Sequence, residues 1–347
     1  GTVTLDDSVS TCDMDGVLDG GETGKLHIEV KNKGSATISG TKVSVSAPSI
    51  MFPSGNSATL PDIAPFQSAT VDVAVTLDAN VMAITKVPFA ITLENAAACD
   101  PSVSETRSFI THMDDVPNDS TTETADSEKA PWVKWGAPGF ESLADGVWTR
   151  TEQNNGNFRF NGQDYPTHSD TAFESPDLVV GGGAFSVTFK HAFDFESSPQ
   201  NPGDPDTRWD GGLIEISSDG GASWQDVSAF ASPGYNGTIA NVMNADNPLA
   251  DRPAFVARNG AWPNMSNLTL DFGGAFANKT VKLRFRIGTD AAAGVPDYLG
   301  WYIDDIAAAG ITNKPFHVVT PDAPGCNLPP VADAGMDLVV DEGTLVM

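Results

Sequence analysis

Glycine and proline residues divide this chain into many short segments, and their distribution constrains its fold more than any other feature. The 33 glycines and 24 prolines are scattered without a fixed period, so they indicate turns rather than a collagen-like repeat or a disordered chain. Between them, apolar and polar residues alternate over short runs, as in strands with one buried face. We therefore predict an all-β protein, and its 347 residues suffice for more than one hydrophobic core.

The first expected domain is a small antiparallel sandwich over residues 1–112. Its alternating runs occupy residues 25–46, 69–77 and 87–93, with a turn at Asn32-Lys33-Gly34. This spacing of strands and polar turns favours an immunoglobulin-like topology over a barrel. Residues 113–129 follow, rich in Asp, Ser, Thr and Glu and nearly free of apolar side chains. That composition cannot bury a face, so it predicts a linker.

A second, larger sandwich of jelly-roll type is expected over residues 130–312, where all seven tryptophans lie. Its loops at 196–211 and 231–262 are longer than a simple connection requires, and such loops are often functional or ordered by a metal. Residues 313–347 are expected to be a linker followed by the first strand of a further unit. The strand-like runs of the second sandwich lie at residues 147–151, 184–193, 212–218, 267–272 and 280–287, and its hairpin turn is at Asp219-Gly220-Gly221.

The charge balance limits the partners of this chain. Acidic residues outnumber basic ones 46 to 19, for a net charge of −27, which repels nucleic acid and anionic membranes. No run of 18 apolar residues predicts a membrane span, and Gly1 to Asp7 lack the features of a signal peptide. We expect the chain to be part of a longer protein, because its last residues, 344–347, read as an unfinished strand.

One acidic turn is the sharpest local signal. Asp13, Asp15, Asp19 and Glu22 stand at relative positions 1, 3, 7 and 10 around Gly16, so alternate carboxylates can point inward at a sharp bend, as calcium requires. The pattern departs from an EF-hand, which needs a glutamate at position 12. A calcium site is the sharper interpretation, and an acidic turn leading into a strand is the plainer one.

A second calcium position is expected in the larger sandwich. Trp301 and Ile303 would face the core while Tyr302 and Asp304 face the other way. Asp305 would then lie at an inward register, where a bare carboxylate is costly, unless the strand ends there. Asp304 or Asp305 is the expected calcium ligand. Calcium would be held there together with carboxylates of an acidic loop, and the alternative is a carboxylate that bonds backbone amides at the end of the sheet. The expected partners from the loop are Asp194, Glu196 and Asp210.

Loop aromatic residues are candidates for a carbohydrate platform, because the apolar face of a sugar stacks on Trp or Tyr. The alternative is that these rings fasten long loops to the sandwich. The candidates are Trp209, Tyr235, Trp262 and Tyr298.

The cysteine count is odd. A Cys12–Cys99 disulfide would close a long loop worth about 4 to 5 kcal/mol in the chain-entropy model, given an oxidising compartment. Cys326 would then be free, or paired with a cysteine elsewhere in a longer protein.

Catalytic motifs are missing from the sequence. It has no His-Glu-x-x-His zinc motif, no Gly-x-Ser-x-Gly elbow and no phosphate-binding loop. The five histidines are far apart and lack metal-ligand spacing. Paired carboxylates for glycoside hydrolysis stay open, because their separation is set by the fold. We predict a non-enzymatic chain.

Three stretches resemble known extracellular modules. Residues 15–34 (DGVLDGGETGKLHIEVKNKG) resemble the opening of bacterial immunoglobulin-like adhesion repeats. Residues 212–224 (GLIEISSDGGASW) and 300–306 (GWYIDDI) resemble the paired signatures of MAM-like jelly rolls. Residues 329–343 look like the first strand of a polycystic-kidney-disease-type repeat.

Such modules accompany secreted bacterial metallopeptidases similar to immune inhibitor A and to the fungalysin family. The resemblance therefore implies a calcium-stabilised, extracellular accessory region that spaces neighbouring domains and binds protein or glycan surfaces. The alternatives are a jelly-roll glycoside hydrolase and a free-standing carbohydrate-binding adhesin.

Overall fold

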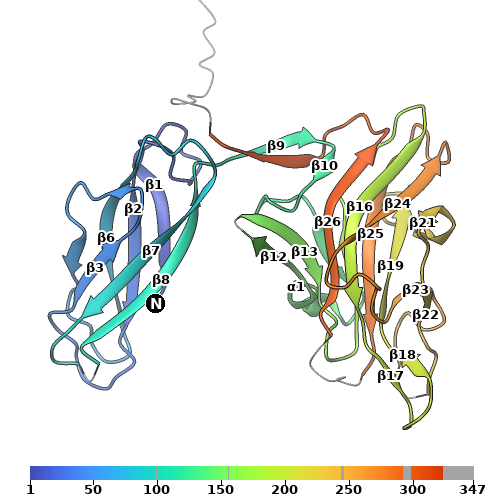
Figure 1. Cartoon of the computed structure of the whole chain (residues 1–347), viewed down its shortest axis with the longest axis horizontal. Coiled ribbons are helices and arrows are strands. Elements are labelled where there is room, and N and C mark those ends of the chain that lie inside the picture. Colours follow the sequence, from blue (N-terminus) through green and yellow to red (C-terminus); the bar gives the residue numbers. More distant parts are fainter. Residues whose placement is uncertain (99, 155, 244–245, 292–297, 323–347) are drawn as a thin grey trace, which may run out of the picture. The chain divides into compact units, whose positions relative to one another are not determined.

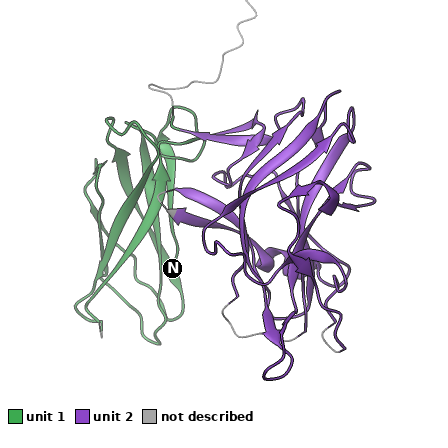
Figure 2. Ribbon diagram, turned by 45° about the vertical axis from the view of Figure 1, so that its right-hand side comes forward, with its two compact units in different colours: residues 1–114, 321–347 green, residues 115–320 purple. Residues whose placement is uncertain are grey.

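The computed structural model describes residues 1–98, 100–154, 156–243, 246–291 and 298–322. The chain divides into two compact units, unit 1 (residues 1–114 and 321–347) and unit 2 (residues 115–320). Figure 2 colours them separately. Both are built from antiparallel strands, as the sequence predicts. None of the helices in the described part of the chain combines the length and the apolarity that a membrane crossing needs.

Unit 1 is a sandwich of two four-stranded sheets. The alternating runs become strands whose inward residues, such as Leu26, Val43, Val75 and Phe89, form one hydrophobic core. One sheet has the order β1 (Val3–Ser10), β2 (Thr23–Lys31), β6 (Ser68–Leu77), β4 (Ile50–Met51), and the other β5 (Ser57–Thr59), β3 (Lys42–Ser46), β7 (Thr85–Glu94), β8 (Ser102–Thr111).

Unit 2 is a larger sandwich with an aromatic core (Figure 1). The first sheet has the order β12 (Trp148–Asn154), β13 (Asn157–Gly162), β26 (Gly300–Ala309), β16 (Phe185–Asp194), β24 (Ser266–Gly273), β21 (Ala231–Ser232), with β10 (Thr122–Glu123) also paired to β26. The second has the order β11 (Val133–Gly136), β14 (Ser169–Glu174), β25 (Thr280–Thr289), β19 (Gly211–Ser217), β23 (Pro253–Val256), β22 (Gly237–Thr238).

Smaller elements complete unit 2. β15 (Leu178–Val179) pairs with β25, and β20 (Gln225–Asp226) pairs with β19 across the predicted turn at Asp219-Gly220-Gly221. Two-stranded pairs form between β17 (Ser197–Pro199) and β18 (Asp206–Arg208) and between β9 (Asp114–Ser120) and β27 (Phe316–Thr320). The short helices are η1 (Glu141–Leu143), α1 (Ala144–Val147) and η2 (Ser228–Phe230).

The core of unit 2 lies between its two sheets. Trp301 and Ile303 of β26 face this core and are fully buried, as their alternation predicts. Gly212 of β19 lies directly against the Trp301 ring, because a Cβ there would stand 2.5 Å from the indole. The glycine therefore makes room for one of the buried tryptophans of the core.

The structure differs from the sequence analysis at the expected linker. Residues 113–129 contribute β9 and β10 to the strands, and Glu123, Ala125 and Ser127 are buried. Residues 316–320, also expected in a linker, form β27, where Phe316 packs in the core of unit 2 beside Trp132. A few buried side chains and pairing between strands order both segments, which composition alone does not reveal. The expected strand of a further unit lies outside the described residues.

Candidate metal centres

The loop between β1 and β2 gathers carboxylates in unit 1. We call the group the acidic loop cluster. Its residues form several overlapping triads, and within each triad the three ligand atoms, carboxylate oxygens or one imidazole nitrogen, lie within 4.8 Å of one another. The four predicted residues are all in this group. The cluster consists of Asp7, Asp13, Asp15, Asp19, Glu22, His112, Asp114 and Asp322.

Backbone amides hold the loop in its shape. Val17 donates to Asp15 Oδ1 at 2.7 Å, and Asp19 donates to Glu22 Oε2 at 3.0 Å. The amide of Cys12 donates to the other oxygen of Glu22. Gly16 has a φ of 94°, a backbone conformation that favours glycine. The sequence pattern of acids around a flexible bend therefore forms a real turn with its carboxylates drawn together.

The electrostatics of the cluster are unfavourable without a cation. Burial raises the pKa of Asp19 to about 8, and the negative charges of Asp322 and Glu22 raise it further. Burial also raises the pKa of Asp15 to about 6, with Asp13 and Asp7 adding to the effect. Asp19 is only 2% exposed, and its Oδ2 has no hydrogen-bond partner among the described residues. A divalent ion would relieve this repulsion.

Unit 2 contains a second group, which we call the buried carboxylate cluster. Glu196, Asp210 and Asp290 place an oxygen each within 4.8 Å of one another, and they are 9%, 2% and 3% exposed. Asp164 adjoins Asp210. Burial raises the pKa of Asp164, with the charges of Glu196 and Asp194 adding to the effect, and burial together with Asp164 raises the pKa of Asp210. Asp164 Oδ1 lacks a hydrogen-bond partner in the described part of the chain.

Hydrogen bonds fix the buried carboxylate cluster in place. Asp164 Oδ2 accepts from the Glu196 amide at 2.8 Å, and Asp210 Oδ1 accepts from the Asp290 amide at 2.7 Å and from Asn247 Nδ2 at 3.2 Å. Glu196 and Asp210 were predicted from the sequence. Asp164 and Asp290 were not, because strand pairing brings them from distant parts of the sequence.

The other predicted ligands of unit 2 lie elsewhere. Asp194 binds Arg258 in a bidentate ion pair, with distances of 2.8 and 2.7 Å. Asp305 pairs with Lys190 at 2.6 Å, and Asp304 Oδ1 accepts from the Asp305 amide at 2.8 Å. This last contact corresponds to the alternative of a carboxylate that bonds backbone.

Asp304 and Asp305 lie in the middle of β26, whereas Asp194, next to the acidic loop, pairs with Gly300 at the beginning of that strand. The pairing of β16 with β26 shifts register between Thr188 and Lys190, and Asp305 takes a φ of 50°. This irregularity falls within β26 rather than at its end, and it changes the direction of the side chains there. Asp304 remains 6% exposed, and burial raises its pKa to about 6.

The predicted aromatic platform residues fasten loops. Trp209 Nε1 donates to Ser198 Oγ at 2.9 Å, and Tyr298 donates to the Ser197 carbonyl at 2.9 Å. The Tyr235 hydroxyl bonds the backbone of Ile214, at 2.8 Å from its nitrogen and 3.1 Å from its oxygen. Trp262 stacks on Tyr302 with ring centroids 4.9 Å apart. These contacts are those of the alternative, in which rings staple loops to the sandwich.

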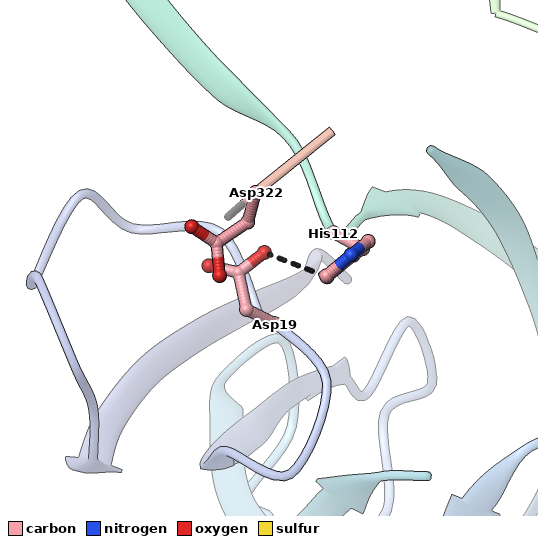
Figure 3. Close-up of side chains that lie close together, drawn as sticks. All are labelled: Asp19, His112 and Asp322. Atoms are coloured by element: carbon pink, nitrogen blue, oxygen red, sulfur yellow. Dashed lines mark ion pairs between the residues drawn. The ribbon is translucent and has the colours of Figure 1, made fainter. Parts of the chain in front are cut away.

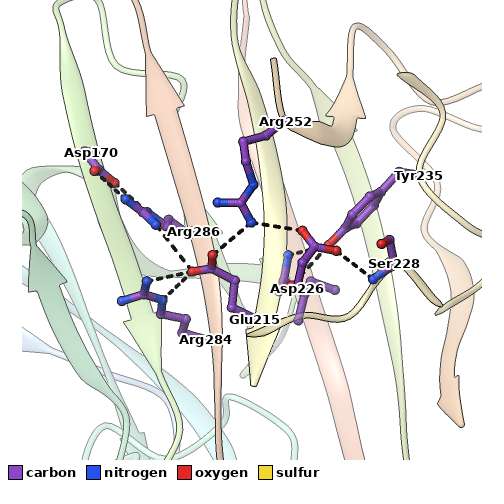
Figure 4. Close-up of polar contacts among 9 residues, drawn as sticks. Asp170, Glu215, Asp226, Ser228, Tyr235, Arg252, Arg284 and Arg286 are labelled. Atoms are coloured by element: carbon purple, nitrogen blue, oxygen red, sulfur yellow. Dashed lines mark hydrogen bonds and ion pairs between the residues drawn. The ribbon is translucent and has the colours of Figure 1, made fainter. Parts of the chain in front are cut away.

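A charged face of unit 2 was not predicted. On the outer side of β19 and β25, Glu215 accepts from Arg284 Nε at 2.7 Å and from Arg252 Nη2 at 2.9 Å (Figure 4). The Arg284 guanidinium lies 4.8 Å from the ring centroid of Trp135 and 4.2 Å from that of Trp224. Burial alone would raise the pKa of Glu215, but Arg284 and Arg286 outweigh it and lower the pKa. The alternation of Lys282, Arg284 and Arg286 along β25 is the sequence signal for this face.

The predicted disulfide stays a prediction. Cys12 lies in the loop between β1 and β2, whereas Cys99 lies outside the described residues. Cys326 also lies outside them.

Comparisons with known proteins give loose similarities. No family model matches the sequence, and no curated protein matches it. Among solved structures, the chain is similar to the secreted serine protease VesC from Vibrio cholerae, with 12% identity and a TM-score of 0.22 over 90% of this chain and 51% of the protease. The chain therefore spans about half the length of that protein.

Two other solved structures are similar over most of their own length. The K3 cleaved adhesin domain of Lys-gingipain from Porphyromonas gingivalis matches with 19% identity and a TM-score of 0.28, over 54% of this chain and 97% of that domain. A carbohydrate-binding module of the β-sandwich superfamily matches with 13% identity and a TM-score of 0.27, over 88% of this chain and 96% of that one. Similarities this loose carry no argument about function.

Proposed function

We propose that this chain is a non-catalytic, calcium-stabilised accessory region of a secreted bacterial protein that spaces neighbouring domains and binds protein or glycan surfaces. A metallopeptidase is the parent that we propose, on the resemblance of residues 15–34, 212–224 and 300–306 to modules of such enzymes. The observation that carries the proposal is that two groups of carboxylates, one in each unit, draw their oxygens together within 4.8 Å in buried or half-buried positions.

The geometry of both groups suits calcium. Calcium–oxygen bonds are about 2.4 Å long, so two ligands on opposite sides of one ion lie about 4.8 Å apart. The oxygens of Asp7, Asp13 and Asp15, and those of Glu196, Asp210 and Asp290, all fall within that limit. Extracellular calcium modules bind with dissociation constants of about 10⁻⁴ to 10⁻³ M, which suits a site made of polar loops.

Burial argues against glycoside hydrolysis at these groups. A glycosidase needs two carboxyl groups that flank a bound sugar. Asp210 and Asp290 are 2% and 3% exposed, so a sugar cannot reach them without rearrangement. The carboxylates are therefore better placed to hold an ion than to act on a substrate.

The binding surface that we propose is the outer face of β25 around Arg284. Trp135 and Trp224 are half-buried there and are held by cation–π contact with the guanidinium. Preoriented indoles favour stacking with sugar rings at low entropic cost. Glycan-array binding should fall in Trp135→Ala and Trp224→Ala and stay unchanged in Trp262→Ala; equal binding by all three variants would remove this surface from the proposal.

A calcium titration followed by thermal melts tests the stabilisation. Calcium at 100 times the dissociation constant stabilises a site by about 2.7 kcal/mol, so we expect an increase in Tm of several degrees. Asp15→Asn should remove the part that belongs to unit 1, and Asp290→Asn the part that belongs to unit 2. Asp62→Asn, at an exposed aspartate, is the matched control. A melting curve that calcium leaves unchanged would refute the proposal.

A further inference from the structure

One triad of the acidic loop cluster has a different chemistry from the rest. Asp19, His112 and Asp322 each place one ligand atom within 4.8 Å of the other two (Figure 3). Asp19 lies in the β1–β2 loop, His112 directly follows β8, and Asp322 follows β27. This triad includes an imidazole nitrogen, whereas the triad of Asp7, Asp13 and Asp15 has only carboxylate oxygens.

Two atoms of the triad are buried without a partner. Asp19 is 2% exposed and His112 is 3% exposed. Neither Asp19 Oδ2 nor His112 Nε2 has a hydrogen-bond partner within the residues that the structure describes. An unsatisfied buried polar group costs about 1 to 3 kcal/mol. The Asp19 oxygen is an atom that a metal held by this triad would satisfy, whereas His112 meets Asp19 through its other nitrogen, Nδ1.

No direct hydrogen bond joins His112 to Asp19. His112 Nδ1 lies 3.8 Å from Asp19 Oδ1, which is too long for a hydrogen bond. His112 Nδ1 accepts a long hydrogen bond from the Gly20 amide at 3.4 Å. Asp19 Oδ1 accepts instead from the Met113 amide at 3.2 Å. The distance between His112 Nδ1 and Asp19 Oδ1 therefore suits two ligands of one metal ion better than a direct hydrogen bond between the side chains.

The charge of the cluster leaves room for a second ion. The acidic loop cluster contains seven carboxylates, and one calcium ion offsets only two negative charges. Calcium takes oxygen ligands, whereas an imidazole with two carboxylates is a donor set typical of zinc and similar divalent metals. We propose that Asp19, His112 and Asp322 bind a zinc ion at a position separate from the calcium position at Asp7, Asp13 and Asp15.

The zinc position would join three segments of unit 1 that are far apart in the sequence. Closing such long loops stabilises a fold by reducing the freedom of the unfolded chain. The zinc triad shares no residue with the triad of Asp7, Asp13 and Asp15, although Asp13 also forms triads with Asp19 and with Asp322. The Asp15→Asn variant below separates the two proposals.

The test uses the full chain without an affinity tag, stripped of metal and then saturated with calcium. Zinc is titrated by calorimetry, and bound zinc is counted by mass spectrometry after dialysis. We expect one zinc ion per chain, weakened at least about tenfold in His112→Gln and in Asp322→Asn. His27→Gln is the matched control, because His27 also lies between two aspartates, Asp6 and Asp72, but belongs to neither metal-binding triad. Cobalt(II) provides a spectroscopic probe, whose visible spectrum should change in His112→Gln and not in His27→Gln.

Several results would overturn the zinc position. They are zinc affinity unchanged in both His112→Gln and Asp322→Asn, no zinc bound when calcium is saturating, or a loss of zinc in His27→Gln. Circular dichroism checks that each metal-free variant is folded, and Asp322→Asn decides the question should the buried His112→Gln not fold. Asp15→Asn separates the two proposals, because it should remove calcium stabilisation and leave zinc binding within about twofold.

Discussion

At the scale of single residues, the charged side chains of unit 2 are of two kinds. Those on the outer face of β25 are paired, as Glu215 is with Arg252 and Arg284. Those of the buried carboxylate cluster repel one another. Neutralising one residue of an ion-pair network leaves its charged partners unpaired. Neutralising one of several carboxylates that repel one another instead reduces the repulsion. The two groups should therefore respond to neutral substitutions in opposite directions when calcium is absent.

Glu215→Gln should be strongly destabilising. Glu215 and Arg284 have side chains that are 4% and 6% exposed, so the substitution leaves a buried guanidinium without its main partner. We expect a loss of about 3 to 5 kcal/mol in the free energy of unfolding, measured with chemical denaturant. Asp226→Asn, which affects the more exposed pair with Arg252, should cost about 1 kcal/mol or less. A loss below 1 kcal/mol in Glu215→Gln would contradict the network.

His191 should make unit 2 sensitive to acid. Burial lowers the pKa of His191 to about 4, and its Nδ1 accepts from Trp301 Nε1 at 3.2 Å. The unfolded chain takes up a proton near pH 6.5, whereas the folded protein does not until about pH 4. The free energy of unfolding should therefore fall by up to about 3 kcal/mol between these values.

The matched variant for this prediction is His191→Gln, which keeps an acceptor for Trp301 but does not titrate. We expect it to be less stable than the original protein at pH 7 and to lose less stability between pH 6.5 and pH 4. Denaturant unfolding at several pH values, with calcium present throughout, measures the difference. Equal pH slopes in the two proteins would show that His191 does not control this behaviour.

At the scale of elements, alternation predicted the strands that contribute most to each core. β2, β6, β7, β16, β19 and β25 all lie where apolar and polar residues alternate or where apolar runs end at turns. β9 and β10 were missed because they lie in a polar stretch and are ordered by pairing with β27 and β26, and β27 was missed because it is a short apolar segment within an expected linker. Local pattern predicts a strand that supplies its own buried face, and it misses one that does not.

The candidate sites follow the same division. Asp13, Asp15, Asp19 and Glu22 were found because one short loop contains them. His112, Asp322, Asp164 and Asp290 were missed because strand pairing brings them in from distant segments. The structure does not bring Asp304 and Asp305 into the group of Glu196 and Asp210, because they lie in the middle of β26 rather than at the end of a strand.

Phe316 should fix β27 in place. Its side chain is 1% exposed and its ring lies 6.2 Å from that of Trp132. Phe316→Ala removes this contact and leaves a cavity, so we expect a loss of about 3 to 5 kcal/mol in the free energy of unfolding. Lys314→Ala, which removes an exposed ion pair with Asp119, should cost less than about 1 kcal/mol. Equal losses in the two variants would place Phe316 outside the core.

At the scale of the whole molecule, the chain has two separate principal cores. Leu26, Val75 and Phe89 belong to that of unit 1, and Phe285 and Trp301 to that of unit 2. Each core can support a cooperative transition of its own. The stability of the chain is therefore a property of two units rather than one.

Calorimetry should resolve two unfolding transitions. Phe89→Ala should lower the Tm of one by about 10 °C or more and leave the other within about 2 °C, and Phe285→Ala should do the reverse. A single transition that both variants shift equally would show that the units unfold together.

The triad of Asp19, His112 and Asp322 also sets an order of events during synthesis. Its members leave the ribosome near the beginning, in the first third and close to the end of the described residues. A nascent chain that has not yet reached Asp322 has only two of the three side chains. A protease that cuts between His112 and Asp322 leaves Asp322 on a different polypeptide fragment from Asp19 and His112. Only an uncut chain therefore carries all three side chains of the triad on one polypeptide.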